Sequence, residues 1–259
     1  MQNIQGIHDD HHLTDARIIK DAANRLDISI LGLIETNLNW NKGNLQQRIK
    51  TAFNPRSHHR QSSMNPTDTE QSTYLPGGTA TIVNEPWTSK TSSTTDPTGM
   101  GRWSEISLQG RNHKSITIIT AYRVCINNSG THDDNTAFSQ QWKHLLSTNN
   151  TSPDPRKEIF NDLTNRITAL RERKSEVIIL IDANEHMYQR SKGRLPKWVQ
   201  DNQLIDIHAL RHDSADEPET QKRGTHRIDF IFISPPLIPF ITASGILPYN
   251  TLGKGDHRP

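Results

Sequence analysis

The sequence feature that most restricts the fold is a helix-then-strand pattern that occurs twice. Residues 14–26 and 156–172 place apolar side chains on one helical face, as expected for helices that cover a core. Each predicted helix leads into a short apolar run, at residues 28–34 and 177–181, which is typical of a buried strand. The pattern therefore predicts an α/β domain in which helices cover sheets.

Shorter apolar runs and polar stretches divide the rest of the chain. We expect strands at residues 79–83, 103–108, 115–121, 226–233 and 240–247, and a short helix near 195–202. The stretches 54–73 and 88–99 are rich in Ser, Thr and Pro and are expected to be loops. Long loops in a compact domain commonly serve substrate binding.

Composition excludes several kinds of protein. The only cysteine is Cys125, so neither an intrachain disulfide nor a four-cysteine zinc site can form. No stretch has the length of a membrane span, and the N-terminus lacks a secretory signal pattern. We expect an intracellular protein that is not secreted, with the nucleus as one location. The net charge of +2 is small, so a nucleic-acid partner would have to be attracted by a local patch.

Both helix-then-strand units end in a carboxylate, Glu35 in the first and Asp182 in the second. Strand ends in helix-covered sheets are common places for functional sites, and carboxylates there can bind a hard divalent cation. Asn184 follows Asp182 by two residues, so on an extended chain both side chains share a face. The carboxylate can orient a water while the amide donates to a phosphate oxygen. The alternative is that these residues only end strands or form a turn.

Asp256 and His257 follow a glycine-flanked turn near the C-terminus and offer a metal ligand or proton carrier beside an imidazole. His257 needs an acid to fix its tautomer, and Asp229 within an apolar strand is the candidate. A carboxylate in such a strand costs about a few kcal/mol unless it is paired, which favours this partnership. Tyr122 ends the strand at 115–121 and can donate to a phosphate or simply cap a core strand.

In their order along the chain, these motifs resemble the endonuclease/exonuclease/phosphatase superfamily. These DNase I-like proteins include apurinic endonucleases and the endonuclease domains of non-LTR retrotransposons. The matching segments are Asn3-Ile-Gln-Gly-Ile7, Glu35 in Gly-Leu-Ile-Glu-Thr-Asn, Tyr122 in Ile-Thr-Ala-Tyr-Arg, Asp182 with Asn184, Arg227-Ile-Asp-Phe230 and Gly255-Asp-His257. The resemblance spans nearly the whole chain and implies a four-layer α/β sandwich, with two mainly antiparallel sheets face to face and helices on both outer sides.

The resemblance also implies a metal-dependent phosphodiester hydrolase. The catalytic residues it implies are His257, as general base or transition-state stabiliser oriented by Asp229, together with Asp182 and Tyr122. Asn3 and Asn184 would bind the scissile phosphate, with Tyr122 beside them. Glu35, with Asp256, would hold Mg²⁺, with Mn²⁺ as the alternative metal.

Two departures from the family pattern affect these expectations. Gly255 stands where relatives have a serine, and Gln5 stands where some have Asp or Asn, which removes one contact to a metal or water. The chain begins at the Asn3 motif and stops at Pro259, short of the last strand of the family. We therefore expect one domain over residues 1–259 that is truncated at both ends.

DNA is the substrate that the sequence favours among those of the family. Segments such as Gly77-Gly-Thr-Ala and Gly101-Arg-Trp-Ser-Glu look like retroelement endonuclease domains that precede a reverse transcriptase. Cations are scattered in the predicted loops at Arg56, Arg60, Lys192, Arg194, Lys197, Lys222 and Arg223. The alternatives are a phosphatase acting on a phosphorylated lipid or inositol, and a catalytically inactive relative that only binds.

Overall fold

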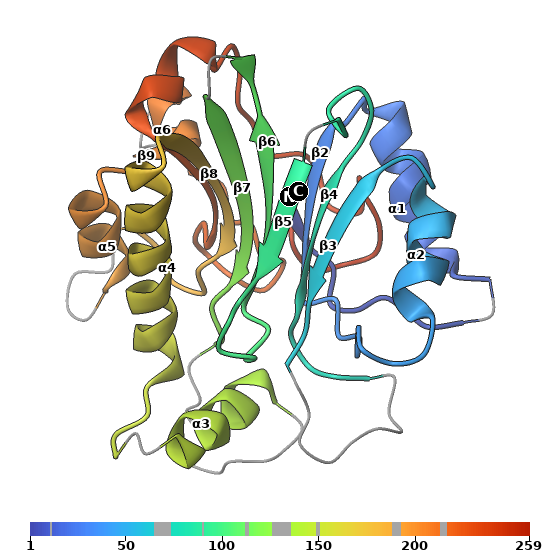
Figure 1. The fold of residues 1–259 in the computed structure, drawn as a ribbon, viewed down its shortest axis with the longest axis horizontal. Coiled ribbons are helices and arrows are strands. Elements are labelled where there is room, and N and C mark those ends of the chain that lie inside the picture. Colours follow the sequence, from blue (N-terminus) through green and yellow to red (C-terminus); the bar gives the residue numbers. More distant parts are fainter. Residues whose placement is uncertain are drawn as a thin grey trace.

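Two β-sheets pack face to face, and helices cover their outer faces, in a computed structural model of the chain (Figure 1). The structure describes residues 1–10, 12–64, 74–89, 91–111, 114–125, 136–148, 151–187, 193–212 and 217–259. Lys192 and residues 65–73, which belong to the cations and loops predicted above, lie outside these ranges. Within these ranges, no helix has both the length and the apolar character needed to cross a membrane.

The smaller sheet has four strands. Their order is β1 (Gln2–Asn3), β2 (Ile30–Ile34), β4 (Thr79–Val83) and β3 (His58–Ser62). β1 runs parallel to β2, and the other pairs are antiparallel. The outer face of this sheet is covered by α1 (Thr14–Arg25) and α2 (Leu45–Phe53), whose apolar side chains face the sheet.

The larger sheet has six strands. Their order is β5 (Thr91–Thr95), β6 (Trp103–Gln109), β7 (Ser115–Tyr122), β8 (Ser175–Asp182), β10 (Asp229–Ile233) and β9 (Ile205–Asp206). Only the β7–β8 pair is parallel among these neighbours. Parallel neighbours need a long crossover, and α4 (Pro155–Glu172) lies within this one.

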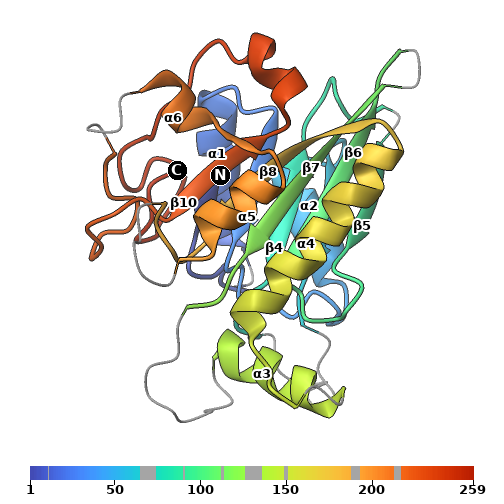
Figure 2. The same ribbon diagram turned by 90° about the vertical axis from the view of Figure 1, so that its left-hand side faces the viewer.

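Helices α4 and α5 (Leu195–Asp201) lie side by side over the outer face of the six-stranded sheet (Figure 2). The buried face of α4 includes Ile159, Leu163 and Ile167, which pack against Ile179 and Phe232 of the sheet. α3 (Ala137–Ser147) lies at one end of the sandwich, while α6 (Ile207–Arg211) and the 3-10 helix η3 (Pro235–Phe240) lie toward the other.

Small hydroxyl side chains fill part of the space between the two sheets. Thr81 on β4 donates to the Thr120 hydroxyl on β7 at 2.8 Å and also contacts Ser104 on β6. These residues are fully buried, and their mutual hydrogen bonds satisfy groups that burial would otherwise leave unpaired. Gly32 on β2 has no side chain at the same interface, which lets the sheets approach closely.

The predicted four-layer α/β sandwich with mainly antiparallel sheets is confirmed. Three local predictions are wrong. β3 and β5 lie in the stretches 54–73 and 88–99 that were expected to be loops, because edge strands tolerate polar side chains that a core strand does not. The strand expected at 240–247 is absent: η3 extends to Phe240, and residues 241–247 are irregular and half-buried or exposed, so their apolar side chains do not form a core strand.

Candidate active site

Strand ends from both sheets converge at one edge of the sandwich. Tyr122 at the end of β7 lies opposite Asp182 at the end of β8, and Asp182 lies opposite Asp229 at the start of β10. From the smaller sheet, Asn3 on β1 pairs in register with Ile34, the residue before Glu35. The fold therefore brings both helix-then-strand carboxylates to the same place.

His257 and Asp229 form a buried pair. His257 Nδ1 lies 2.7 Å from Asp229 Oδ2, and the two residues are 3% and 7% exposed. Burial acts to lower the pKa of His257, but the hydrogen bond and charge of Asp229, with the charges of Asp182 and Asp256, raise that pKa to about 9. The pairing suggested by the sequence is thus present, and the raised pKa favours the imidazolium form at neutral pH.

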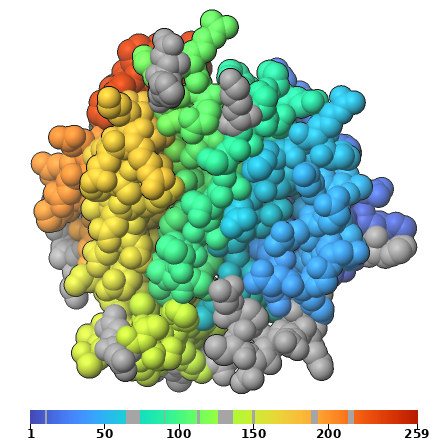
Figure 3. Space-filling view, viewed as in Figure 1, coloured from blue at the N-terminus to red at the C-terminus, as the bar shows by residue number. Residues whose placement is uncertain are grey.

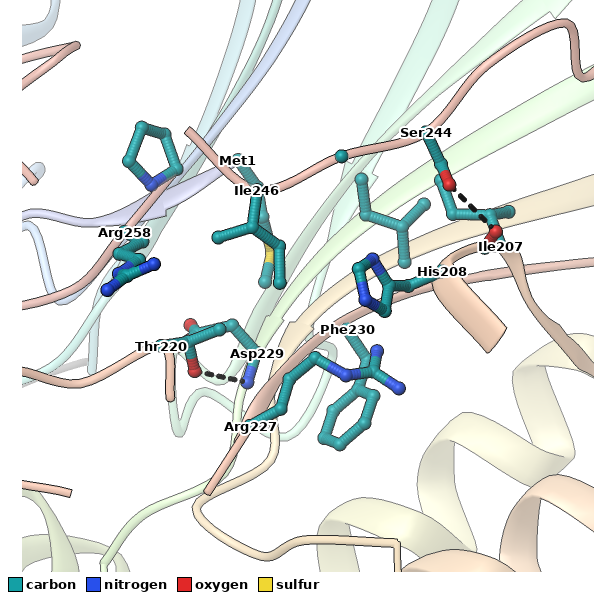
Figure 4. Close-up of a pocket in the computed structure, with 13 residues that line it drawn as sticks. Met1, Ile207, His208, Thr220, Arg227, Asp229, Phe230, Ser244, Ile246 and Arg258 are labelled. Atoms are coloured by element: carbon teal, nitrogen blue, oxygen red, sulfur yellow. Dashed lines mark hydrogen bonds between the residues drawn. The ribbon is translucent and has the colours of Figure 1, made fainter. Parts of the chain in front are cut away.

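The segment around Thr220 holds this pair in position. The backbone N–H of Asp229 donates to Thr220 Oγ1 at 3.2 Å (Figure 4). Thr220 in turn accepts at its carbonyl from the N–H of Arg258 at 2.7 Å, and Gln221 forms a β-bridge with His257. A small cavity borders Asp229 and is also lined by Thr220 and Arg258.

Asp182 is fully buried and held from two directions. Asn3 Nδ2 donates to Asp182 Oδ2 at 2.9 Å, and the N–H of Asn184 donates to Asp182 Oδ1 at 3.0 Å. Burial, followed by the charge of Asp229, raises the pKa of Asp182 to about 8. A carboxylate with such a pKa is suited to accept a proton near neutral pH.

Asn184 adopts a left-handed backbone with φ of 46°, and both ends of its side-chain amide and its backbone carbonyl are hydrogen-bonded. Its Nδ2 donates to the carbonyl of Arg123 at 2.8 Å, and its Oδ1 accepts from Cys125 Sγ at 3.0 Å. Its carbonyl accepts from Arg156 Nη2 at 3.0 Å. These contacts fix which end of the amide group faces the site.

Glu35 and Tyr122 lie on the same side of the site. Burial raises the pKa of Glu35, while hydrogen bonding with Tyr122 and Asn3 acts in the opposite direction. The Tyr122 side chain is buried, and burial together with the Glu35 charge raises the pKa of its hydroxyl well above the usual value. Tyr122 therefore keeps its proton at neutral pH and can donate a hydrogen bond.

Two carboxylate oxygens of the site point to a cation. Asp229 Oδ1 and Asp256 Oδ1 are buried without a hydrogen-bond partner among the described residues. Asp182, Asp229 and His257 also place one ligand atom each within 4.8 Å of one another. This set of two oxygen donors and one nitrogen donor is able to bind a metal ion, although the contacts do not decide which metal. It differs from Glu35 and Asp256, the ligands expected from the sequence, and that assignment stays a prediction.

Sequence reasoning missed the residues that surround Asn184. Arg123 is 2% exposed and donates to Glu185 Oε2 at 2.6 Å, while Arg156 donates to the Asn184 carbonyl. Cys125 was considered only for its inability to form a disulfide. The one available signal was that Arg123 and Cys125 follow Tyr122 by one and three residues at a strand end.

Comparison with known proteins places this geometry in a structural context. No protein-family model and no curated protein matches the chain in sequence. An AP endonuclease from Leishmania major superposes with a TM-score of 0.67 at 13% identity, covering 99% of this chain and 84% of that one. An endonuclease/exonuclease/phosphatase protein from Beutenbergia cavernae superposes with a TM-score of 0.60 at 12% identity, over 99% and 68%.

The endonuclease domain of TRAS1, a telomere-specific non-LTR retrotransposon, has a TM-score of 0.54 at 13% identity, over 94% of this chain and 89% of that one. The chain has the DNase I-like fold. This fold of endonuclease/exonuclease/phosphatase proteins is what the sequence motifs predicted. Likeness at such low identity shows the fold alone, so the catalytic and ligand roles of the eight site residues stay predictions.

Proposed function

We propose that this protein is a divalent-metal-dependent phosphodiester hydrolase that nicks DNA, in the manner of a retroelement endonuclease. The observation that carries the proposal is the buried Asp229–His257 pair, which lies beside Asp182, itself held by Asn3, in a group that could hold a metal ion. DNA as the substrate is supported by proteins of the same fold, whose names include an AP endonuclease and a 3' phosphatase bound to a DNA hairpin.

In the proposed reaction, Asp229 keeps the Nδ1 proton of His257 in place and leaves Nε2 to face the phosphate. Because the pKa of His257 is raised to about 9, this side chain acts as a cationic donor that stabilises charge on the phosphoryl oxygens. Asp182, whose pKa is raised to about 8, accepts the proton of the attacking water. Asn3 holds Asp182 through Nδ2, which fixes the direction of the carboxylate.

Glu35 and Asp256 are proposed to hold Mg²⁺, with Mn²⁺ as a substitute. This assignment is supported by Asp256 Oδ1, which accepts no hydrogen bond from the described residues and lies 3.7 Å from His257 Nε2, and by the effect of the Asp256 charge on the pKa of Glu35. When bound, the metal would neutralise charge on the phosphoryl and leaving oxygens. Asn184 and Tyr122 would donate to the scissile phosphate beside it.

The proposal is tested by nicking of supercoiled plasmid in the presence of Mg²⁺. The wild-type protein should convert supercoiled to open-circular DNA, and EDTA should abolish this activity. Both His257→Ala and Asp229→Asn should lower the nicking rate by about 100-fold or more. His12→Ala, on the exposed segment before α1, is the matched control and should retain the wild-type rate. Equal nicking by wild type and His257→Ala would contradict the mechanism.

The same assay separates the alternative functions. Release of phosphate from an inositol phosphate without plasmid nicking would identify a phosphatase. Binding to DNA without any cleavage would identify an inactive binding relative. A retroelement origin, with nuclear localisation and fusion to a reverse transcriptase, predicts a reverse transcriptase reading frame beside this coding sequence in the genome.

A further inference from the structure

A groove with polar and charged side chains along both sides runs along the outer layer between α4 and α5 and has a volume of about 700 Å³. Helix α4 lines one side with Lys157, Asn161 and Asn165, which follow at every fourth residue. Helix α5 lines the other side with Arg194, at its N-cap, and Lys197. At 1.5 Å per residue, the α4 row extends about 12 Å, which is enough to follow two successive phosphates of a nucleic-acid strand. We call this feature the basic groove.

The floor of the basic groove is fixed before any ligand binds. The rings of Trp198 and Phe160 stack with centroids 4.7 Å apart. Trp198 Nε1 donates to the Phe160 carbonyl at 3.1 Å and lies 3.0 Å from Thr164 Oγ1. Asn202 Nδ2 donates to the same hydroxyl at 3.0 Å. A preformed surface loses less entropy on binding than one that must be ordered.

The basic groove is connected to the candidate active site through both of its helices. At the start of α5, the N–H of Leu195 donates to Glu185 Oε1 at 2.6 Å, and Glu185 follows Asn184 in sequence. In the first turn of α4, Arg156 donates to the Asn184 carbonyl. Figure 3 shows α4 in yellow as an exposed ridge with part of α5 in orange beside it.

The charges that line the basic groove favour an anion. The lining includes the cations Lys157, Arg194 and Lys197 and one acid, Asp201. Asp201 pairs with Lys197 at 2.9 Å, and Arg194 pairs with Asp154 outside the lining at 2.8 Å. Exposed ion pairs of this kind contribute little to stability, so phosphate oxygens can replace the acids as partners. The side-chain amide of Asn165 is a further donor of the kind that contacts phosphates, whereas Asn161 Nδ2 already donates to Glu158 Oε2 at 3.2 Å.

We propose that the basic groove binds the sugar–phosphate backbone of DNA beside the cleaved phosphate. This inference rests on the proposed function and extends it, because it adds a DNA-binding surface whose residues take no part in the cleavage reaction. Contacts of this kind position the substrate without reading bases, so the groove would raise affinity for long DNA irrespective of sequence.

The test measures binding of a long fluorescent DNA duplex in EDTA, where no cleavage takes place, over a range of salt concentrations. The groove variant carries Lys157→Gln, Arg194→Gln and Lys197→Gln. In a plot of log affinity against log salt concentration, the slope of this variant should be smaller in magnitude than that of wild type by about 2 to 3. Each lost phosphate contact is expected to reduce the slope by roughly 0.9. Its control carries Arg17→Gln, Lys20→Gln and Arg25→Gln on α1, which removes the same charge from the opposite outer layer and should keep the wild-type slope.

Cleavage separates this inference from the proposed function. With Mg²⁺, the groove variant should cut a short duplex that reaches only the candidate active site at the wild-type rate, while its KM for long DNA should rise. A wild-type slope in the groove variant, with normal nicking by wild type, would overturn the groove alone. Equal loss of slope in both triple variants would also overturn it, because net charge would then explain the binding. Failure of wild type to cut any DNA would instead refute the proposed function.

Discussion

Asp182 and Asp229 lie directly opposite each other on the neighbouring antiparallel strands β8 and β10. Both are buried, and the charge of Asp229 helps to raise the pKa of Asp182. Close carboxylates repel each other, and a proton or a cation between them relieves this repulsion. This arrangement is destabilising for the folded chain and is compatible with a site built for a bound ligand.

Mg²⁺ should therefore stabilise the folded protein. A ligand that binds only the folded state adds about 2.7 kcal/mol at a concentration of 100 times Kd, and this should appear as a higher melting temperature in calorimetry. The double variant Glu35→Gln/Asp256→Asn should lose the increase, whereas Asp21→Asn, exposed on α1, should keep it. An increase of the same size in the double variant would show that other groups bind the metal.

Cys125 should act as a positioning residue for Asn184. Its thiol donates to Asn184 Oδ1, so Cys125→Ala removes one of the bonds that hold the amide, a change of about 0.5–1.5 kcal/mol. We expect KM for DNA to rise by about threefold to tenfold with little change in kcat. Cys125→Ser keeps a donor and should restore most of the affinity. If Ser and Ala variants behaved alike, the hydrogen bond would have no role in positioning.

Gly32→Ala should destabilise the contact between the two sheets. A Cβ atom at this position would lie 2.7 Å from Leu180 Cδ1 and 2.8 Å from Thr120 Oγ1, so the packed interface would have to shift. Overpacking of this kind costs about 1–3 kcal/mol, measured as a loss in the free energy of unfolding in urea. Gly245→Ala is the control, because its added Cβ meets no atom within 4 Å. Equal stability of the two variants would show that the sheets can separate slightly without cost.

Stability should fall as the pH decreases below neutrality because of His59 on β3. Burial, followed by the charges of Lys50 and His58, lowers the pKa of His59 to about 3 from its ordinary value of 6.5. The unfolded chain therefore binds a proton between these two values and the folded chain does not. The stability contributed by neutral His59 is complete above pH 6.5 and is lost toward pH 3, by at most about 1.4 kcal/mol per pH unit.

His59→Gln removes this titration, so its free energy of unfolding should decrease less between pH 7 and pH 5 than that of wild type, within the range set by the two pKa values. Denaturation in urea at several pH values measures the difference. His12→Gln replaces an exposed histidine and should follow the wild-type curve. Parallel curves for wild type and His59→Gln would mean that His59 accepts its proton in the folded state.

Only part of the fold and of the candidate active site could be predicted from the sequence. The carboxylates Glu35 and Asp182 were predictable because each follows a strand with a clear apolar pattern. The strands β3 and β5 were not predictable, because their polar composition at sheet edges resembles that of loops. The partners of Asn184 were not predictable either, since Arg156 donates to its carbonyl from helix α4, and a contact between distant segments leaves no pattern in local sequence.

The side-chain amide of Gln2 donates to the carbonyl of His257 at 3.0 Å and so joins two points 255 residues apart in the chain. Because the candidate active site is closed by contacts between the two ends of the described chain, no partly folded segment contains it. Hydrolytic activity would therefore require that folding is complete. Local unfolding at either end would abolish this activity while the cores of both sheets remain intact.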